Sequence, residues 1–308
     1  MKSKIRLALE IIFCVLILGF LISKIHIRET IDILRNVDLF WIGIGVIVYL
    51  IALVITAYSL KVLFDSIKYT PIMEWMRFYL VGFSMGLILP GRAGDLSIIY
   101  FAKQKGFDIG ASTAFTITDK LITLIIFGII AALGIFTILN STELYWGLLF
   151  ALLCIIAGSF LFTPIARRWV VKMIGKYAST FQGFYKTFKN LLLHHKDKVF
   201  INIFITFLRP LGNAFLIILI FKAMGIDVSF LYAILINAVT LIVSLVPLTP
   251  NGLGIREGVG AFLFSRIGVP LEATVAMYVI ILMMNYATGI IGTGIYLSSG
   301  ARQKSNKA

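Results

Sequence analysis

Residues 89–96 read LPGRAGDL, which places a proline, two glycines, an arginine and an aspartate between two strongly apolar runs. Proline removes a backbone hydrogen bond from a helix, and glycine allows backbone conformations that other residues avoid. The stretch therefore predicts an interruption of a helix. Why two opposite charges accompany that interruption depends on where the flanking apolar runs lie.

The composition of the chain is that of an integral membrane protein. It has 308 residues, of which 60% are hydrophobic and 14% are charged, whereas soluble domains have about 45–50% and about 25%. The net charge of +14 comes from short basic clusters between apolar runs, the pattern of loops that face the cytoplasm. We expect a multi-pass protein of the cell membrane and no nucleic-acid partner.

Six apolar runs are close to the ~20 residues that a helix needs to cross a bilayer. They are residues 7–23, 39–64, 111–139, 144–162, 199–221 and 271–297. Two further apolar stretches, 73–102 and 230–264, are interrupted by PGRAGD and PLTPNGLGIREG. The second leg of each is only about 10 Å long as a helix, too short to cross. Each stretch is either a re-entrant hairpin or one span followed by a loop.

Loop charge favours the hairpins. Segment 163–198 carries many basic residues and the single acid Asp197, which predicts a cytoplasmic amphipathic loop on the membrane surface. We count membrane crossings from this loop toward each end of the chain. The basic N- and C-termini are then both cytoplasmic only if each interrupted stretch leaves the membrane on the same side from which it enters. The scheme leaves Lys24, Arg28 and Arg35 outside.

The order of the segments indicates an internal repeat. Span, hairpin and span follow one another in 39–139 and again, in the opposite orientation, in 199–297. The motif PGRAGD of the first half corresponds in position to PNGLGIRE of the second, and KGFDIGASTAF corresponds to IGVPLEATVAM. The predicted fold is one all-α membrane domain over 1–308, with about six transmembrane helices and two re-entrant hairpins in an inverted-topology repeat. Such repeats place substrate sites near the bilayer midplane.

The interruptions predict two apices surrounded by protein, since backbone groups without hydrogen bonds are unfavourable in hydrocarbon. The apex residues are Pro90, Gly91, Gly94, Pro250, Gly252 and Gly254. Arg92 and Arg256 can bind a phosphate in a bidentate manner, and helix N-termini at the apices also favour anions. Asp95 and Glu257 can cap the returning helices or hold the arginines. The alternatives are two structural salt bridges or a polar path for a phosphate headgroup.

Three further charged residues are candidates for headgroup binding. Asp119 and Lys120 lie about two turns into their span, where they either face a cavity or reach back to the membrane surface. Arg209 precedes Pro210 inside another span. It either neutralises the carbonyl groups freed by the proline or makes a third phosphate contact.

The chain shows no pattern of a catalytic or metal site. It has no Gly-x-Ser-x-Gly, P-loop, His-Glu-x-x-His or nucleotide-binding fingerprint. Cys14 and Cys154 lie in apolar runs without metal-ligand spacing. We expect no enzyme activity, cofactor or metal; a membrane-embedded enzyme is the disfavoured alternative.

Taken together, LPGRAGDL at 89–96, TDKLITL at 118–124 and PLTPNGLGIREG at 247–258 resemble the lysylphosphatidylglycerol synthase transmembrane region, or flippase-like (UPF0104) family. The resemblance implies a translocase that moves aminoacylated phosphatidylglycerol between leaflets, while a separate soluble domain of two-domain members makes that lipid. We expect this chain to lack the synthase domain. Asn251 stands where glycine is common, and Asp119 with Lys120 replaces a glutamate–arginine pair.

These observations lead to two hypotheses. The first is a flippase-like translocase in which Arg92 and Arg256 share one midplane cavity. It would move the headgroup of an anionic or aminoacylated phospholipid, or of a polyprenyl-phosphate lipid, across the bilayer. The alternative is a non-transporting membrane partner that binds such a lipid and presents it to a transferase through the basic loop.

Overall fold

The computed structural model describes residues 26–88, 97–139, 183–245 and 252–305, together with Gly19, Ser23 and Thr249, and side chains as far as residue 297. Every regular element within these ranges is a helix. The helices are α2 (Ile27–Arg35), α3 (Leu39–Phe64), α4 (Ile72–Ile88), α5 (Ser97–Gln104), α6 (Ile109–Ile138), α9 (Phe184–His194), α10 (Lys196–Ala223), α11 (Phe230–Ser244), α12 (Ile255–Arg266) and α13 (Leu271–Ser305).

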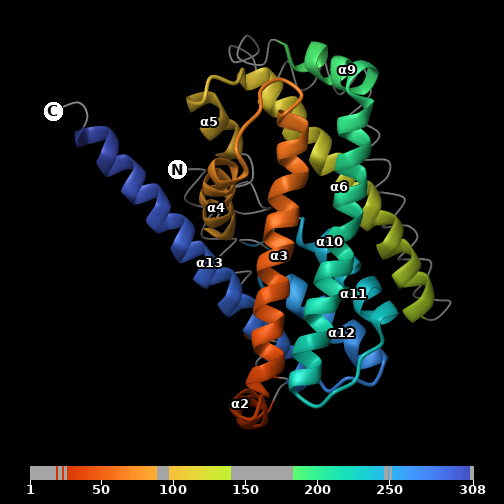
Figure 1. Cartoon of the computed structure of the whole chain (residues 1–308). Coiled ribbons are helices and arrows are strands. Elements are labelled where there is room, and N and C mark those ends of the chain that lie inside the picture. Colours follow the sequence, from red (N-terminus) through yellow and green to blue (C-terminus); the bar gives the residue numbers. More distant parts are fainter. Residues whose placement is uncertain are drawn as a thin grey trace, which may run out of the picture.

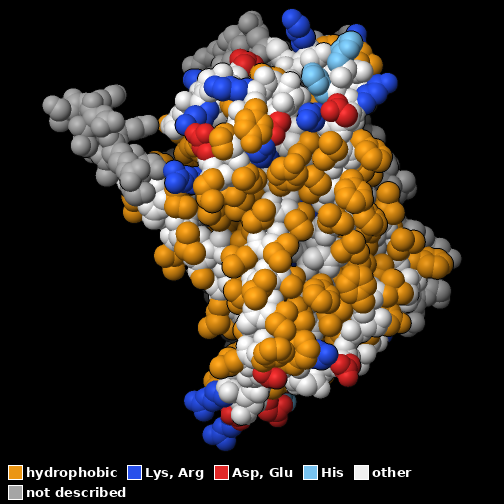
Figure 2. Space-filling view, viewed as in Figure 1, with side chains coloured by type: hydrophobic (Ala, Val, Ile, Leu, Met, Phe, Trp, Pro, Cys, Tyr) orange, Lys and Arg blue, Asp and Glu red, His pale blue; other side chains and the backbone are white. Residues whose placement is uncertain are grey.

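Four of these helices are long and apolar enough to cross a membrane, namely α3, α6, α10 and α13. They confirm four of the six predicted spans. The span predicted at 144–162 lies outside the described residues, as does nearly all of the span at 7–23. Figure 2 shows a belt of hydrophobic side chains between two ends where charged side chains gather, as expected for a protein that spans a bilayer.

The helix packing relates the first half of the chain to the second. Along the centre of the molecule α3 packs against α10, while α6 packs against α11 and α13 against α4 (Figure 1). At the two ends, α9 packs against α6 and α2 against α13. The five helices α2 to α6 can be matched in order with the five helices α9 to α13. In this matching the contact of α6 with α11 corresponds to that of α13 with α4, and the contact of α9 with α6 corresponds to that of α2 with α13. The contact of α3 with α10 corresponds to itself.

Both interrupted stretches contain two separate helices. The first consists of α4 and α5, and the second of α11 and α12, with contact between the helices of each pair. At the second interruption Gly252 and Gly254 have φ of 73° and 86°, which glycine accepts without strain. A side chain at Gly252 would also overlap Ser244.

The predicted apex residues Gly252 and Gly254 are the two that the structure describes. Outside the described residues lie Pro90, Gly91, Arg92, Gly94, Asp95 and Pro250.

Helix α13 approaches α4 closely because small residues line the contact. Ser84 Oγ of α4 lies 2.8 Å from the carbonyl oxygen of Gly289 in α13. A Cβ atom at Gly292 would overlap the Leu80 carbonyl oxygen and Ser84 Oγ. The backbone of α4 therefore occupies the space that a side chain at position 292 would need.

We expect Gly292→Ala to lower the free energy of unfolding by about 1–3 kcal/mol, because the added methyl group overpacks the contact between α4 and α13. Thermal unfolding in detergent measures the effect. Gly294→Ala on the same helix is the matched control, since a Cβ atom there meets nothing within 4 Å. Equal melting temperatures for the two variants would show that α4 and α13 do not need this close approach.

The two ends of the molecule differ in charge. We call them the α9 end and the α2 end after the helices found there (Figure 1). Basic residues at or near the α9 end are Lys61, Lys68, Arg77, Lys103, Lys105, Lys186, Lys189, Lys196 and Lys198. Those at the α2 end are Arg28, Arg35, Lys222 and Arg266. Within the described residues the α9 end therefore has the larger basic excess.

Candidate functional site

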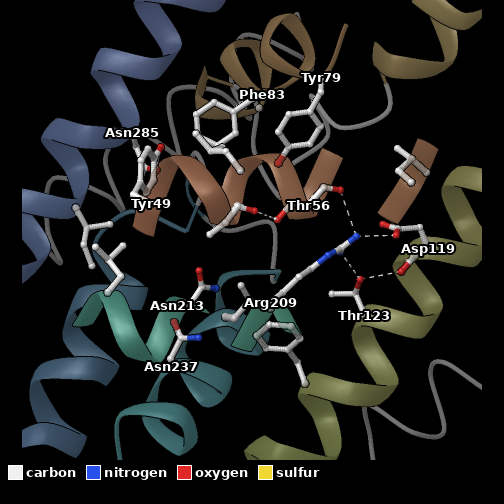
Figure 3. A pocket seen from close by; sticks show the side chains of 18 of the residues that line it. Tyr49, Thr56, Tyr79, Phe83, Asp119, Thr123, Arg209, Asn213, Asn237 and Asn285 are labelled. Atoms are coloured by element: carbon white, nitrogen blue, oxygen red, sulfur yellow. Dashed lines mark hydrogen bonds and ion pairs between the residues drawn. The ribbon is translucent and has the colours of Figure 1, made fainter. Parts of the chain in front are cut away.

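A cavity of about 190 Å³ lies in the interior of the helix bundle. Side chains from α3, α4, α5, α6, α10, α11, α12 and α13 line it, so that both halves of the chain contribute (Figure 3). Its charged and amide residues are Asp119, Lys120, Arg209, Asn213, Asn237, Arg256 and Asn285. A polar cavity inside a membrane bundle is rare without a function, because polar groups are unfavourable in hydrocarbon.

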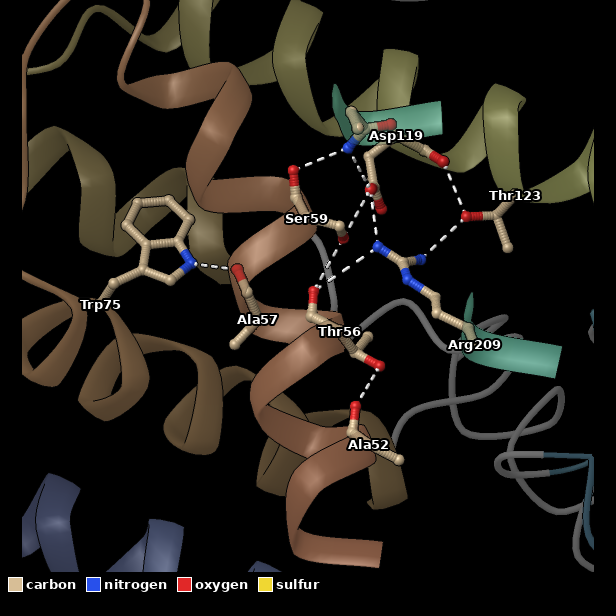
Figure 4. Close-up of polar contacts among 9 residues, drawn as sticks. Ala52, Thr56, Ala57, Ser59, Trp75, Asp119, Thr123 and Arg209 are labelled. Atoms are coloured by element: carbon tan, nitrogen blue, oxygen red, sulfur yellow. Dashed lines mark hydrogen bonds and ion pairs between the residues drawn. The ribbon is translucent and has the colours of Figure 1, made fainter. Parts of the chain in front are cut away.

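The strongest polar contact at the cavity is a buried ion pair between α10 and α6. Arg209 Nη2 lies 2.8 Å from Asp119 Oδ1, and the two side chains are only 7% and 3% exposed. The same carboxylate oxygen accepts a hydrogen bond from Asn202 Nδ2 at 3.0 Å and lies 3.2 Å from Ser59 Oγ. Arg209 Nη1 donates to Thr123 Oγ1 at 3.0 Å (Figure 4). The network joins α3, α6 and α10.

The local sequence positions this network. Arg209 stands at the middle of α10, directly before Pro210, while Asp119 and Thr123 are one turn apart on α6 and so share a face. Of the alternatives left open by the sequence, Asp119 faces the cavity. Arg209 reaches the Thr56 carbonyl oxygen of α3 at 3.5 Å, and its ion-pair partner is Asp119. Lys120 is exposed at the edge of the same cavity.

A neutral contact stands in the corresponding position of the other half. Tyr49 Oη of α3 donates to Asn285 Oδ1 of α13 at 3.0 Å, and both residues line the cavity (Figure 3). In the matching of the two halves, α3 with α13 corresponds to α10 with α6. The two halves thus share an arrangement of helices and differ in charge, since one contact is an ion pair and the other is not.

Arg256 lies at the start of α12 and lines the cavity from the side of the second interruption. Its Nε is buried and has no hydrogen-bond partner, and its guanidinium lies 5.6 Å from the centre of the Tyr278 ring. Among the described residues no carboxylate lies within ion-pair distance of it. Glu257 accepts a hydrogen bond from the Gly254 backbone N–H at 2.6 Å, which is the capping role that the sequence allowed.

The structure therefore brings together part of the predicted site. Asp119, Lys120, Arg209 and Arg256 line one cavity, and Glu257 borders a small adjoining pocket that Arg256 also lines. Because Arg92 lies outside the described residues, whether it shares this cavity with Arg256 stays a prediction. The cavity thus combines Arg256, an arginine without a carboxylate partner among the described residues, with the ion pair between Asp119 and Arg209.

Comparison with known proteins identifies the relationship of the chain. The family described as lysylphosphatidylglycerol synthase TM region matches residues 7–292. This chain belongs to that family. A "UPF0104 membrane protein" from Archaeoglobus fulgidus is 25% identical over 228 residues, which is 66% of this chain and 69% of the relative.

As a member of the lysylphosphatidylglycerol synthase TM region family, the chain is a multi-pass membrane protein. The family match extends over every described helix except the end of α13, so that the cavity lies wholly within it. The resemblance inferred from three short motifs is thus confirmed over nearly the whole chain.

The sequence did not single out several residues of the network. Ser59, Thr123 and Asn202 all contact Asp119 or Arg209, and Tyr49 forms the neutral contact. A signal did exist for Asn202, which is an amide in the otherwise apolar run VFINIFITF. Serine, threonine and tyrosine are too common in membrane helices to stand out.

Proposed function

We propose that this protein is a lipid translocase, which passes a headgroup through the interior cavity while the acyl chains stay in the bilayer. The candidate lipids are an anionic or aminoacylated phospholipid, or a polyprenyl-phosphate lipid. The observation that carries the proposal is Arg256, a cation in a membrane-embedded cavity with no carboxylate partner among the described residues. An arginine in this state is suited to bind a phosphate.

The arrangement of the helices supports this proposal. Exchanged packing pairs such as α6 with α11 and α13 with α4 are what an inverted repeat produces. In transporters built this way, the substrate site lies at the repeat interface near the midplane. In our proposal α4 with α5 and α11 with α12 are the two re-entrant hairpins. The family name, which refers to a phospholipid synthase, also favours a lipid ligand.

The charge of the two ends supports an orientation in the cell membrane. Cytoplasmic loops of membrane proteins carry an excess of lysine and arginine. We therefore place the basic α9 end in the cytoplasm and the α2 end outside. The C-terminal end of α13 is then cytoplasmic, and α9 lies against the anionic inner leaflet.

The proposal predicts lipid movement in a purified system. Proteoliposomes that contain the protein and a tail-labelled fluorescent phosphatidylglycerol should expose the inner-leaflet label to an external quencher faster than protein-free vesicles. The control is an unrelated helical membrane protein reconstituted at the same density. If the protein quenches no faster than this control with any of the candidate lipids, the translocase proposal is wrong.

A second candidate function is a non-transporting partner that presents the lipid to a transferase. The feature that favours it is α9, which exposes Lys186 and Lys189 beside Tyr185, Leu192 and Leu193 at the α9 end. Such a surface suits a partner protein as well as a membrane. Co-purification of a transferase with the intact chain, lost in Lys186→Glu plus Lys189→Glu, together with no lipid movement in isolation, would favour this function.

A further inference from the structure

The long helices α3 and α10 pack against each other along the centre of the molecule (Figure 1). A Cβ atom at Gly212 of α10 would lie 3.7 Å from the Cβ atom of Ala52 in α3, so the two helices are in contact at this point. Tyr49 and Arg209 each stand three residues before that contact. Because α3 begins at the α2 end and α10 begins at the α9 end, Tyr49 lies toward the α2 end and Arg209 toward the α9 end.

The partners of these two residues also occupy matching places. The segments KGFDIGASTAF and IGVPLEATVAM, which correspond in the sequence, contain the same backbone turn, since Gly106 and Gly268 both have φ of 84°. Thr123 of α6 and Asn285 of α13 each lie eight residues beyond these segments. The hydrogen bond of Arg209 with Thr123 and that of Tyr49 with Asn285 are therefore counterparts in the two halves of the chain.

The two contacts lie on opposite sides of the cavity (Figure 3). Toward the α9 end, Arg209 Nη2 also lies 2.8 Å from Asp119 Oδ1, so that an ion pair joins α10 to α6. Toward the α2 end, the hydrogen bond of 3.0 Å between Tyr49 and Asn285 joins α3 to α13. Each contact connects a helix of one half to a helix of the other, so each can break when the halves tilt against each other.

We infer that these two contacts are the gates of the cavity and that they open in turn. The inference rests on the proposed translocase function. In a protein with an inverted repeat, movement of one half against the other exposes the central site first to one side of the membrane and then to the other. The contact of α3 with α10 corresponds to itself and is kept during this movement, whereas the contacts of Arg209 and Tyr49 exchange roles. A headgroup can then cross without a channel that is open to both sides.

Labelling of a cysteine in the cavity tests the inference. Asn213 lines the cavity, and Asn213→Cys is introduced into a chain in which Cys14 and Cys154 are replaced by alanine. The reagent is sulfonatoethyl methanethiosulfonate, an anion that does not cross membranes. It reaches the protein from one face of the membrane in intact cells and from the other face in inside-out vesicles.

Each gate variant should increase labelling from one side. We expect Tyr49→Phe to raise the labelling rate about fivefold from the α2 side, the effect of losing one neutral hydrogen bond. Thr123→Val should raise the rate at least as much from the α9 side, because the hydrogen bond that it loses is to a charged group. Tyr232→Phe and Thr118→Val are the matched controls, since neither residue lines the cavity or the small pocket, and they should change the rate by less than about twofold.

The outcome separates the gates from the translocase proposal, because labelling needs no lipid movement. A rise from the same side in both gate variants, or no rise above their controls, would overturn the inference. If lipid moves in proteoliposomes while labelling gives either of these results, the translocase proposal stands without the gates. If labelling rises from opposite sides and no lipid moves, the gates are supported and the translocase proposal falls.

Discussion

Replacement of Arg256 with alanine is expected to slow the movement of an anionic lipid by about 10- to 100-fold, close to the rate of protein-free vesicles. The magnitude corresponds to the loss of one hydrogen bond between charged groups, worth about 1.5–3 kcal/mol. Arg256→Lys should slow movement less, because lysine keeps the charge but cannot bind a phosphate through two parallel hydrogen bonds. The fluorescence-quenching assay in proteoliposomes measures both variants.

The matched control is Arg266→Ala. Arg266 is at the exposed end of the same helix, α12, and lines neither pocket, so its loss should leave the rate within about twofold of wild type. Thermal unfolding of the three variants shows whether each is folded. If folded Arg256→Ala moves lipid as fast as Arg266→Ala, the central role of Arg256 is disproved.

Replacement of Asp119 with alanine is expected to lower the free energy of unfolding by about 3–5 kcal/mol, the largest effect on stability that we predict. Removal of one partner of a buried ion pair leaves the other charge uncompensated, and Arg209 has no other carboxylate among the described residues. Asn202 would also lose an acceptor. Unfolding in mixed micelles, followed by circular dichroism, measures the change.

Two further variants isolate the cause. Asp119→Leu combined with Arg209→Met removes both charges and should recover much of the loss, as apolar replacements of buried pairs often do. Glu74→Ala breaks the ion pair between Glu74 and Lys105, whose side chains are 34% and 46% exposed, and should cost at most about 1 kcal/mol. If Asp119→Ala is no more destabilising than Glu74→Ala, the ion pair does not hold α6 to α10.

The helices were predictable because their signal is local. Exposure of a run of about 20 apolar residues to water is very unfavourable, so such a run indicates a membrane-spanning helix. This accounts for α3, α6, α10 and α13. Proline and glycine likewise interrupt a helix by their own geometry, and the φ angles at Gly252 and Gly254 agree with the interruption predicted there.

The partners of the charged residues were not predictable in the same way. Asp119 and Arg209 are 90 residues apart, and the sequence offered the membrane surface, a kinked backbone or a phosphate as their partners. Their pairing depends on α6 and α10 meeting at one depth. Arg256 had an acid beside it in the sequence, Glu257, but that carboxylate turns to the Gly254 backbone.

By itself, therefore, the sequence determined the class of protein, four of its membrane-crossing helices, the interruption at Gly252 and Gly254, and the family. These follow from hydropathy and backbone geometry, which act over a few residues. Only the tertiary structure decided that Asp119 neutralises Arg209 and that Arg256 lines the same cavity without a described carboxylate partner. The physical reason is that charge compensation inside a membrane depends on distances of about 3–4 Å between helices far apart in the chain.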